Sequence, residues 1–170
     1  MFFKKKCPIC GAKNSRDATT CASCGTPFEL RQAEGQIAIE DYDEAIRINP
    51  KDAVAYFNRG NAYHSLNKKK RAIEDYDQAI RLNPEYADAY HNRGTTYYDL
   101  GQYNRAIEDY DQTIRLNPGD TVAYNNRGNA YKLWGKKAEA IADFEKFITL
   151  TDNPQWVKIA RQQIEELQSQ

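Results

Sequence analysis

The segment from Arg71 to Pro84 reads RAIEDYDQAIRLNP, and the segment from Arg105 to Pro118 reads RAIEDYDQTIRLNP. The two segments start 34 residues apart and differ at a single position. A second motif has the same period, because NRGNAY at 58–63 returns unchanged at 126–131 and as NRGTTY at 92–97. Two independent motifs with one fixed period indicate an array of a repeated structural unit.

Each unit has the residue spacing of two helices. In the first, a tyrosine, a glycine and a second tyrosine fall on one face, and in the second, two alanines flank an aromatic residue. We expect the glycine to let the two helices approach closely. Asn-Pro pairs at 49–50, 83–84 and 117–118 are expected to end the second helix, since the residue before a proline avoids the helical conformation. In the first complete unit the face positions are Tyr56, Gly60, Tyr63, Ala72, Tyr76 and Ala79.

This period and signature resemble the tetratricopeptide repeat (TPR) family. The resemblance implies a mainly α fold: a solenoid of helical hairpins, wound as a right-handed superhelix. The third repeat departs from the pattern, with Phe147 at a small-residue position and Asp152 where proline is expected. The expected organisation is a separate segment at 1–28 that contains all four cysteines, a linker and half-repeat helix at 29–52, three repeats at 53–154 (53–86, 87–120 and 121–154), and a capping helix at 155–170.

Both ends of the array are irregular. The first-helix half of an earlier repeat is missing, and residues 28–48 fit either a linker followed by a helix or one longer helix with a weak point at Gly35. At the other end, Asp152-Asn-Pro predicts a helix start, because proline suits the first helical turn. One side of this final helix is expected to carry Trp156, Ala160, Ile164 and Leu167, with Ile159 beside them.

All four cysteines lie near the N-terminus, as Cys7, Cys10, Cys21 and Cys24 in the pattern C-x2-C-x10-C-x2-C. Two such pairs can present four thiolates tetrahedrally to one metal ion. The stretch from residue 7 to 28 resembles the short zinc ribbons, which have two knuckles joined by a small hairpin around one structural Zn²⁺. Four thiolates would leave no coordination position for water or substrate, so this zinc would be structural.

The sequence supports other roles of these cysteines less well than zinc binding. Two disulfides need an oxidising compartment, and no export signal is visible. A thioredoxin-type redox pair needs a βαβ context, which the sequence lacks. An iron site of the rubredoxin type has knuckles that lie much further apart.

In TPR proteins the first helices line a concave groove that binds an extended peptide, and the resemblance carries those positions onto this chain. Asparagine is the commonest residue there, and its amide both donates and accepts hydrogen bonds, as a peptide backbone requires. The alternative is that these amides satisfy local backbone groups or face water. The groove residues predicted to bind are Phe57, Asn58, Asn61, His64, His91, Asn92, Tyr98, Asn125, Asn126, Asn129 and Lys132; Val54, Ser65, Asp88, Thr95, Asp99, Val122 and Leu133 share the face.

One TPR subclass binds the C-terminal carboxylates of chaperones with lysine, asparagine and arginine. Here Asn61 and Asn92 match, but Phe57, Val122 and Asn126 replace the basic residues. Such an acidic tail would meet too little positive charge, so we expect no tight binding of it.

A recurring arginine and a recurring aspartate lie 16 residues apart in each repeat. We expect them to pair across the hairpin, the alternative being that the arginines point into the groove. The pairs are Arg59 with Asp75, Arg93 with Asp109, and Arg127 with Asp143.

The chain carries 24 Lys and Arg against 24 Asp and Glu, so its net charge is zero and gives no general attraction to nucleic acid or acidic membranes. No apolar run is long enough to span a membrane, and a cytoplasmic location is expected. No catalytic motif is present. The sequence therefore predicts a non-enzymatic adaptor that binds a protein or peptide partner. The alternatives are a nucleic-acid-associated factor that uses the ribbon and Lys4–Lys6 while the repeats recruit a protein, and a redox or zinc-sensing switch.

Overall fold

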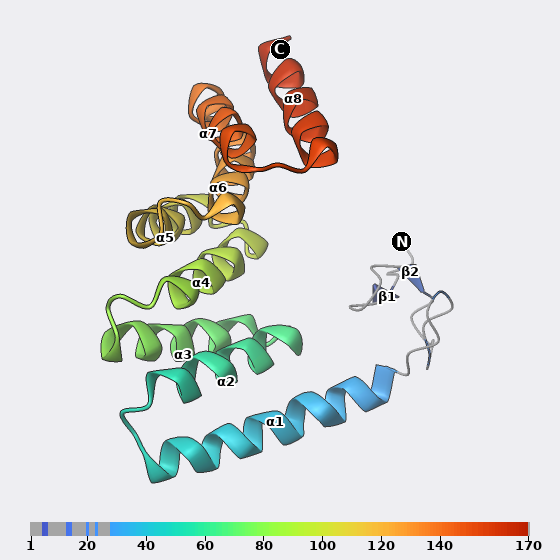
Figure 1. Cartoon of the computed structure of the whole chain (residues 1–170). Helices are drawn as coiled ribbons and strands as arrows, with labels where there is room; N and C mark the ends of the chain where they lie inside the picture. Colours follow the sequence, from blue (N-terminus) through green and yellow to red (C-terminus); the bar gives the residue numbers. More distant parts are fainter. Residues whose placement is uncertain (1–4, 7–12, 15–19, 21–22, 24–27, 170) are drawn as a thin grey trace. The chain divides into compact units, whose positions relative to one another are not determined.

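The computed structural model of this chain describes residues 5–6, 13–14, 20, 23 and 28–169, and its main part consists of helices (Figure 1). It divides into an N-terminal unit, Met1–Asp75, and a C-terminal unit, Tyr76–Gln170. Within the described residues, no helix has both the length and the apolar character needed to cross a membrane. The elements are β1 (Lys5–Lys6), β2 (Lys13–Asn14), α1 (Phe28–Ile48), α2 (Ala53–Ser65), α3 (Lys69–Leu82), α4 (Ala87–Asp99), α5 (Tyr103–Leu116), α6 (Thr121–Leu133), α7 (Lys137–Leu150) and α8 (Pro154–Gln168).

The helix boundaries follow the 34-residue period. The first helices α2, α4 and α6 begin at 53, 87 and 121, and the second helices α3, α5 and α7 begin at 69, 103 and 137. The helices α1, α3 and α5 each end on the residue before an Asn-Pro pair, as predicted. The asparagine of each pair then forms a turn. The side-chain oxygens of Asn49, Asn83 and Asn117 accept hydrogen bonds from the backbone amides two residues later.

α1 is one continuous helix of 21 residues, which confirms the longer-helix alternative. Gly35 lies inside it and packs against the end of α2: a Cβ at this position would come within 2.8 Å of a Leu66 methyl carbon. The expected weak point is therefore a close contact between α1 and α2.

Two glycines hold the hairpins of the C-terminal unit together. A Cβ on Gly94 would lie 3.1 Å from both the Cβ of Asp109 and a ring carbon of Tyr110. A Cβ on Gly128 would lie 3.0 Å from a ring carbon of Phe144. The glycines thus let α4 approach α5 and α6 approach α7, as predicted, and the aromatic rings fill the space.

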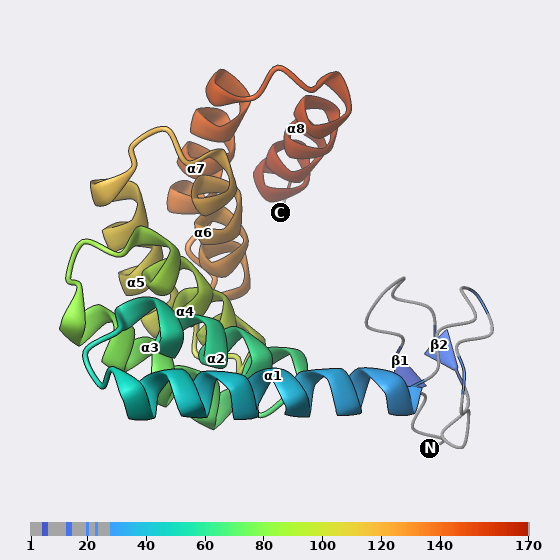
Figure 2. The same cartoon turned by 60° about the horizontal axis from the view of Figure 1, so that its bottom comes forward.

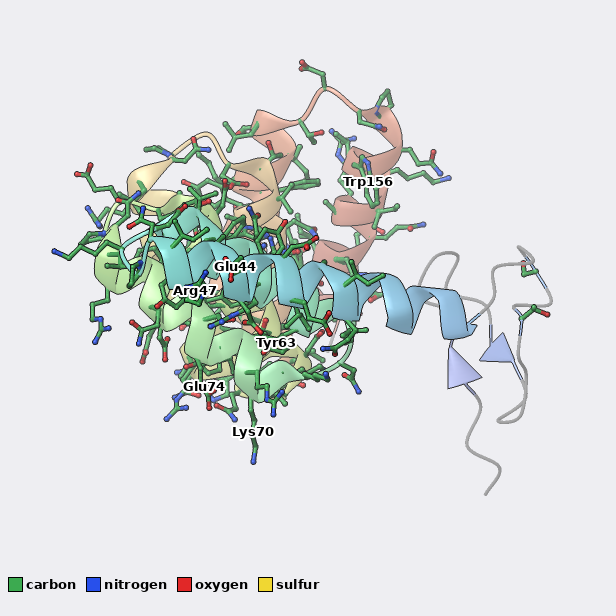
Figure 3. The ribbon with its side chains drawn as sticks, turned by 90° about the horizontal axis from the view of Figure 1, so that it is seen from below. Glu44, Arg47, Tyr63, Lys70, Glu74 and Trp156 are labelled. Atoms are coloured by element: carbon green, nitrogen blue, oxygen red, sulfur yellow. The ribbon has the colours of Figure 1, made fainter. Side chains whose placement is uncertain are left out.

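The C-terminal helix α8 packs against α7, and the two ribbons lie side by side in Figures 1 and 2. Phe147, which departs from the repeat pattern, is buried in one cluster with Ala160 and Leu167 of α8. Of the residues predicted on this side of the final helix, Ala160 and Leu167 are buried, whereas Trp156 and Ile159 are 53% and 40% exposed. Figure 3 shows Trp156 on α8. Ile159 lies beside the buried stripe and Trp156 lies in the first turn of α8, and nothing in the described chain covers either residue fully.

Near the N-terminus, β1 and β2 form an antiparallel ladder with the register Lys5 to Asn14 and Lys6 to Lys13. In the sequence, the two strands flank residues 7–12, which contain the first pair of cysteines and lie outside the described residues.

Candidate functional site

Each recurring arginine binds two aspartates. Arg59 donates two hydrogen bonds, from Nε and Nη2, to the carboxylate of Asp75, at 2.8 and 2.6 Å. Its third donor, Nη1, binds Asp43 of α1 at 2.6 Å. The same arrangement recurs at Arg93 with Asp109 and Asp77, and at Arg127 with Asp143 and Asp111. The predicted pairing across the hairpin is confirmed.

These arginines have a structural role within the fold. The guanidinium of Arg93 lies 5.6 and 6.0 Å from the ring centres of Tyr90 and Tyr97, within the range of a cation–π interaction. Burial alone would lower the pKa of Arg93, but the hydrogen bonds that it donates to Asp109 and Asp77 raise it. Burial also raises the pKa of Asp109, and the hydrogen bonds from Arg93 oppose that rise. The side chains are thus enclosed by ring faces and carboxylates and are not directed into a groove.

The C-terminal unit has a hollow of about 170 Å³ between its first helices and α5. We call it the acceptor hollow. Three of the predicted groove residues line it: Tyr98, Asn126 and Asn129. Thr95, Asp99 and Tyr110 complete the lining.

Two hydroxyl groups of the acceptor hollow form a hydrogen-bond relay. The phenol of Tyr110 donates to Oγ1 of Thr95 at 3.2 Å, and that hydroxyl donates to the backbone carbonyl of His91 at 3.0 Å. Tyr110 is 1% exposed, and burial raises its pKa to about 12. The relay therefore fixes the direction of both hydroxyl protons.

The two asparagines of the acceptor hollow also make local hydrogen bonds. Nδ2 of Asn126 lies 3.3 Å from Nε2 of His91, and Nδ2 of Asn129 donates to the carbonyl of Asn125 at 2.9 Å. Burial lowers the pKa of His91, although Asp120 and Asp88 oppose that effect. A neutral His91 accepts the hydrogen bond from Asn126.

The N-terminal unit has a second, neutral hollow of about 370 Å³. It contains the predicted groove residues Asn58 and Asn61, which lie at the repeat positions of Asn126 and Asn129. The rest of its wall comes from α1 and α2 and carries no charged side chain: Gly35, Ala38, Tyr42, Ala62 and Ser65.

The other predicted groove residues lie outside the two hollows. Lys132 binds α8, through Gln163 and through Glu166 at 3.1 Å, and is therefore engaged within the fold. His91 and Asn125 do not line the acceptor hollow, but they are the hydrogen-bond partners of its asparagines. Phe57 and His64 on α2 and Asn92 on α4 are partly buried.

The four predicted zinc ligands, Cys7, Cys10, Cys21 and Cys24, lie outside the described residues. Within the part of the chain that the structure describes, no cluster of three or more metal-binding side chains is found. The donor set itself, four cysteines in two CxxC pairs, fits a structural zinc ion.

The sequence analysis missed two kinds of residue. It missed the second aspartate of each arginine, although Asp43, Asp77 and Asp111 recur with the 34-residue period. It also missed Tyr110 as a wall of the groove, since an aromatic residue on the second helix is usually core. Its hydroxyl was the available signal, because a buried Tyr O–H needs a partner.

Comparisons with known proteins agree with this architecture. Profiles of the tetratricopeptide repeat match residues 36–67, 60–101, 87–120 and 109–142, and a profile of a zinc-ribbon domain matches residues 3–28. No curated protein matches the chain in a sequence search.

Solved structures share the fold. A crystal structure of MamA is 35% identical with a TM-score of 0.67, and the match covers 68% of each chain. The first TPR domain of Spaghetti (RPAP3), bound to the HSP90 peptide SRMEEVD, is 28% identical with a TM-score of 0.63, over 68% of this chain and 92% of that one. The second TPR domain of human RPAP3, in complex with the HSP70 peptide SGPTIEEVD, is 31% identical with a TM-score of 0.61, over 68% and 94%.

Proposed function

Since the chain belongs to the tetratricopeptide-repeat family and carries an N-terminal zinc-ribbon domain, we propose that it is a non-enzymatic adaptor that binds an extended peptide segment of a partner protein. The binding faces are that of α2 in the N-terminal unit and that of α4 and α6 in the C-terminal unit. The zinc ribbon serves as a structural cap or as a second docking module, with one Zn²⁺ held by its four cysteines.

The observation that carries this proposal is the pair of hollows on the first helices. In both units the wall includes two asparagines at equivalent repeat positions. An amide can hydrogen-bond the backbone of a peptide without reading its side chains. The peptide-bound RPAP3 domains support a peptide as the class of ligand.

A display library of random unstructured peptides, selected on the full chain, tests the proposal. We expect enriched peptides whose affinity falls about tenfold or more in the Asn58→Ala, Asn92→Ala, Asn126→Ala triple variant, because several hydrogen bonds are lost together. Asn104→Ala is the matched control, since Asn104 is exposed on α5, a second helix. Enriched peptides that bind the triple variant as tightly as the wild type would contradict the proposal, as would a selection that yields no binder.

A further inference from the structure

The helix α1 has the repeat position of a second helix, but its own first helix is missing. By the 34-residue period, that first helix would occupy residues 19–31. These positions hold the second cysteine pair and the first residues of α1, which begins at Phe28. α1 packs against α2, which is the first helix of the following repeat (Figure 1). Residues 19–31 therefore do not supply a separate helix that would complete the hairpin of α1.

The complete hairpins of the C-terminal unit show which residues of a second helix receive the first helix. A Cβ on Gly94 of α4 would lie 3.1 Å from the Cβ of Asp109 and from a ring carbon of Tyr110. It would also lie 3.2 Å from the carbonyl oxygen of Ala106. Ala106, Asp109 and Tyr110 are all buried, and so are the residues at the same three positions of α7.

The helix α1 has the same residue types at these three positions, namely Ala38, Asp41 and Tyr42. Asp41 is exposed here, and Ala38 and Tyr42 are partly exposed. Ala45, one turn later, is also partly exposed, although its counterparts in α5 and α7 are buried. We call these four residues the open hairpin face, because no helix of the described chain covers them as α4 covers α5.

Asp41 gives the open hairpin face its charge. Its counterparts Asp109 and Asp143 each accept two hydrogen bonds from the arginine of their own first helix, and their side chains are 5% and 7% exposed. The position of that arginine, 16 residues before Asp41, holds Gly25. Among the residues that the structure describes, Asp41 has no hydrogen-bond or ion-pair partner. Its carboxylate is therefore complementary to an added guanidinium, which can bind both oxygens.

The neutral hollow borders the open hairpin face, since Ala38 and Tyr42 belong to both. The corresponding acceptor hollow of the C-terminal unit has less than half its volume, and α4 contributes Thr95, Tyr98 and Asp99 to the wall. The described lining of the neutral hollow comes from α1 and α2. A helix on the open hairpin face would add the wall that α4 provides in the other unit.

The first helices of this chain show what such an occupant looks like. Each has an arginine followed by a glycine, with one tyrosine three residues before the arginine and another four residues after it. The glycine permits close approach, and the arginine reaches the aspartate. From this we infer that the open hairpin face binds an α-helix of a partner protein that carries arginine and glycine between two aromatic residues in this spacing. The inference goes beyond the proposed function, because the ligand is a helix and its site is on α1.

The chain itself is a poorer source of this helix. Residues 1–27 contain one arginine, Arg16, and an aspartate follows it, so this segment lacks the pattern. The three copies of the pattern in the repeats are engaged within their own hairpins, through the arginine–aspartate pairs. A second copy of the chain would have to open a hairpin to supply its helix.

The test is a titration of the full ¹⁵N-labelled chain, in buffer with Zn²⁺, with a blocked peptide of residues 86–100, which contains α4. We expect saturable binding that shifts the amide signals of the open hairpin face. The helical signal in circular dichroism should increase, because an isolated helix of this length is marginal in water. A peptide with Gly94→Leu should not bind, since its side chain would collide with the ring of Tyr42.

Two variants of α1 separate the site from general attraction to an acidic helix. Asp41→Asn should lower the peptide affinity about tenfold, because the hydrogen bonds to the arginine lose their ionic character. Glu40→Gln removes the same charge from the neighbouring residue, whose counterparts in α3 and α5 are exposed, and should change the affinity by about twofold or less. Both side chains are exposed on α1, so both variants are expected to fold.

Several results would overturn the inference. They are the absence of saturable binding, equal binding of the Gly94→Leu peptide, and equal losses in the Asp41 and Glu40 variants. Binding that appears only after Zn²⁺ is removed by a chelator would assign the open hairpin face to the cysteine segment instead. A dimer of the chain that Asp41→Asn dissociates in analytical ultracentrifugation would assign it to a second copy.

Discussion

The two aspartates of Arg93 differ in burial and therefore in their expected energetic weight. Asp109 has a side chain 5% exposed and forms two hydrogen bonds with the guanidinium, whereas Asp77 is 49% exposed and forms one. Asp109→Ala leaves a largely enclosed arginine without its main partner, and we expect the free energy of unfolding to fall by about 3–5 kcal/mol. Asp77→Ala should cost about 1 kcal/mol or less. Equal losses in urea denaturation would show that burial does not set the strength of these pairs.

His91 makes stability depend on pH. Its pKa in the folded chain is lowered by burial, so the unfolded chain binds more protons and the folded state is favoured at higher pH. The contribution is complete above the unfolded pKa of about 6.5, and it is lost as the pH falls below that value. We expect the free energy of unfolding to fall more steeply for the wild type than for His91→Gln between pH 7.5 and 5, by at most about 1.4 kcal/mol per pH unit. Parallel pH curves for the two proteins in urea denaturation would contradict this assignment.

At the level of the elements, the turn inside each hairpin uses a left-handed residue. Asn67, Gly101 and Gly135 occupy equivalent repeat positions with φ of 59°, 73° and 80°. Replacing Gly101 with alanine should destabilise the chain by about 1–2 kcal/mol, because a Cβ crowds the backbone in this conformation. Gly119→Ala is the control: its φ is not left-handed and no atom lies closer than 3.7 Å to an added Cβ, so we expect a change within about 0.5 kcal/mol. Thermal melts of both variants make the comparison, and similar losses would refute it.

The elements could be predicted wherever local signals decide them. The starts of α2, α4 and α6, the helix ends before Asn-Pro and the arginine–aspartate pairs all follow from a pattern that repeats in the sequence. The exposure of Trp156 and Ile159 does not, because the period predicts only which side of α8 carries them, and the packing of α8 on α7 decides how much of that side is covered. The hydroxyl relay through Tyr110 was not predictable either, since it depends on how α5 packs against α4.

Across the whole molecule, the ribbon and the repeats are expected to respond differently to metal. Metal analysis should find about one zinc per chain, and Cys7→Ser should abolish it, because a segment of this size folds through its metal ligands. The helical signal in circular dichroism should change little, since α2 to α8 are stabilised by their own packing. A large loss of helix on chelation would show that the ribbon supports the repeats.

The residues on the first helices also predict whether the chain binds the acidic C-terminal tails of chaperones. The positions that need basic side chains hold Phe57, Val122 and Asn126, and the acceptor hollow carries Asp99. We expect SRMEEVD and SGPTIEEVD to show no saturable binding at micromolar concentration in fluorescence anisotropy. Saturable binding of either peptide would contradict the charge argument.

The recurring arrangement of one arginine between two aspartates also determines how repeats can be deleted from the chain or duplicated within it. Each arginine takes one aspartate from its own repeat and one from the second helix before it, 16 residues away on either side. Deletion of residues 87–120 would bring Asp77 to the place of Asp111, and duplication of that block would supply a new arginine together with its carboxylates. Whole 34-residue blocks can therefore be deleted or duplicated, as in unequal recombination, without leaving any of these arginines or aspartates unpaired.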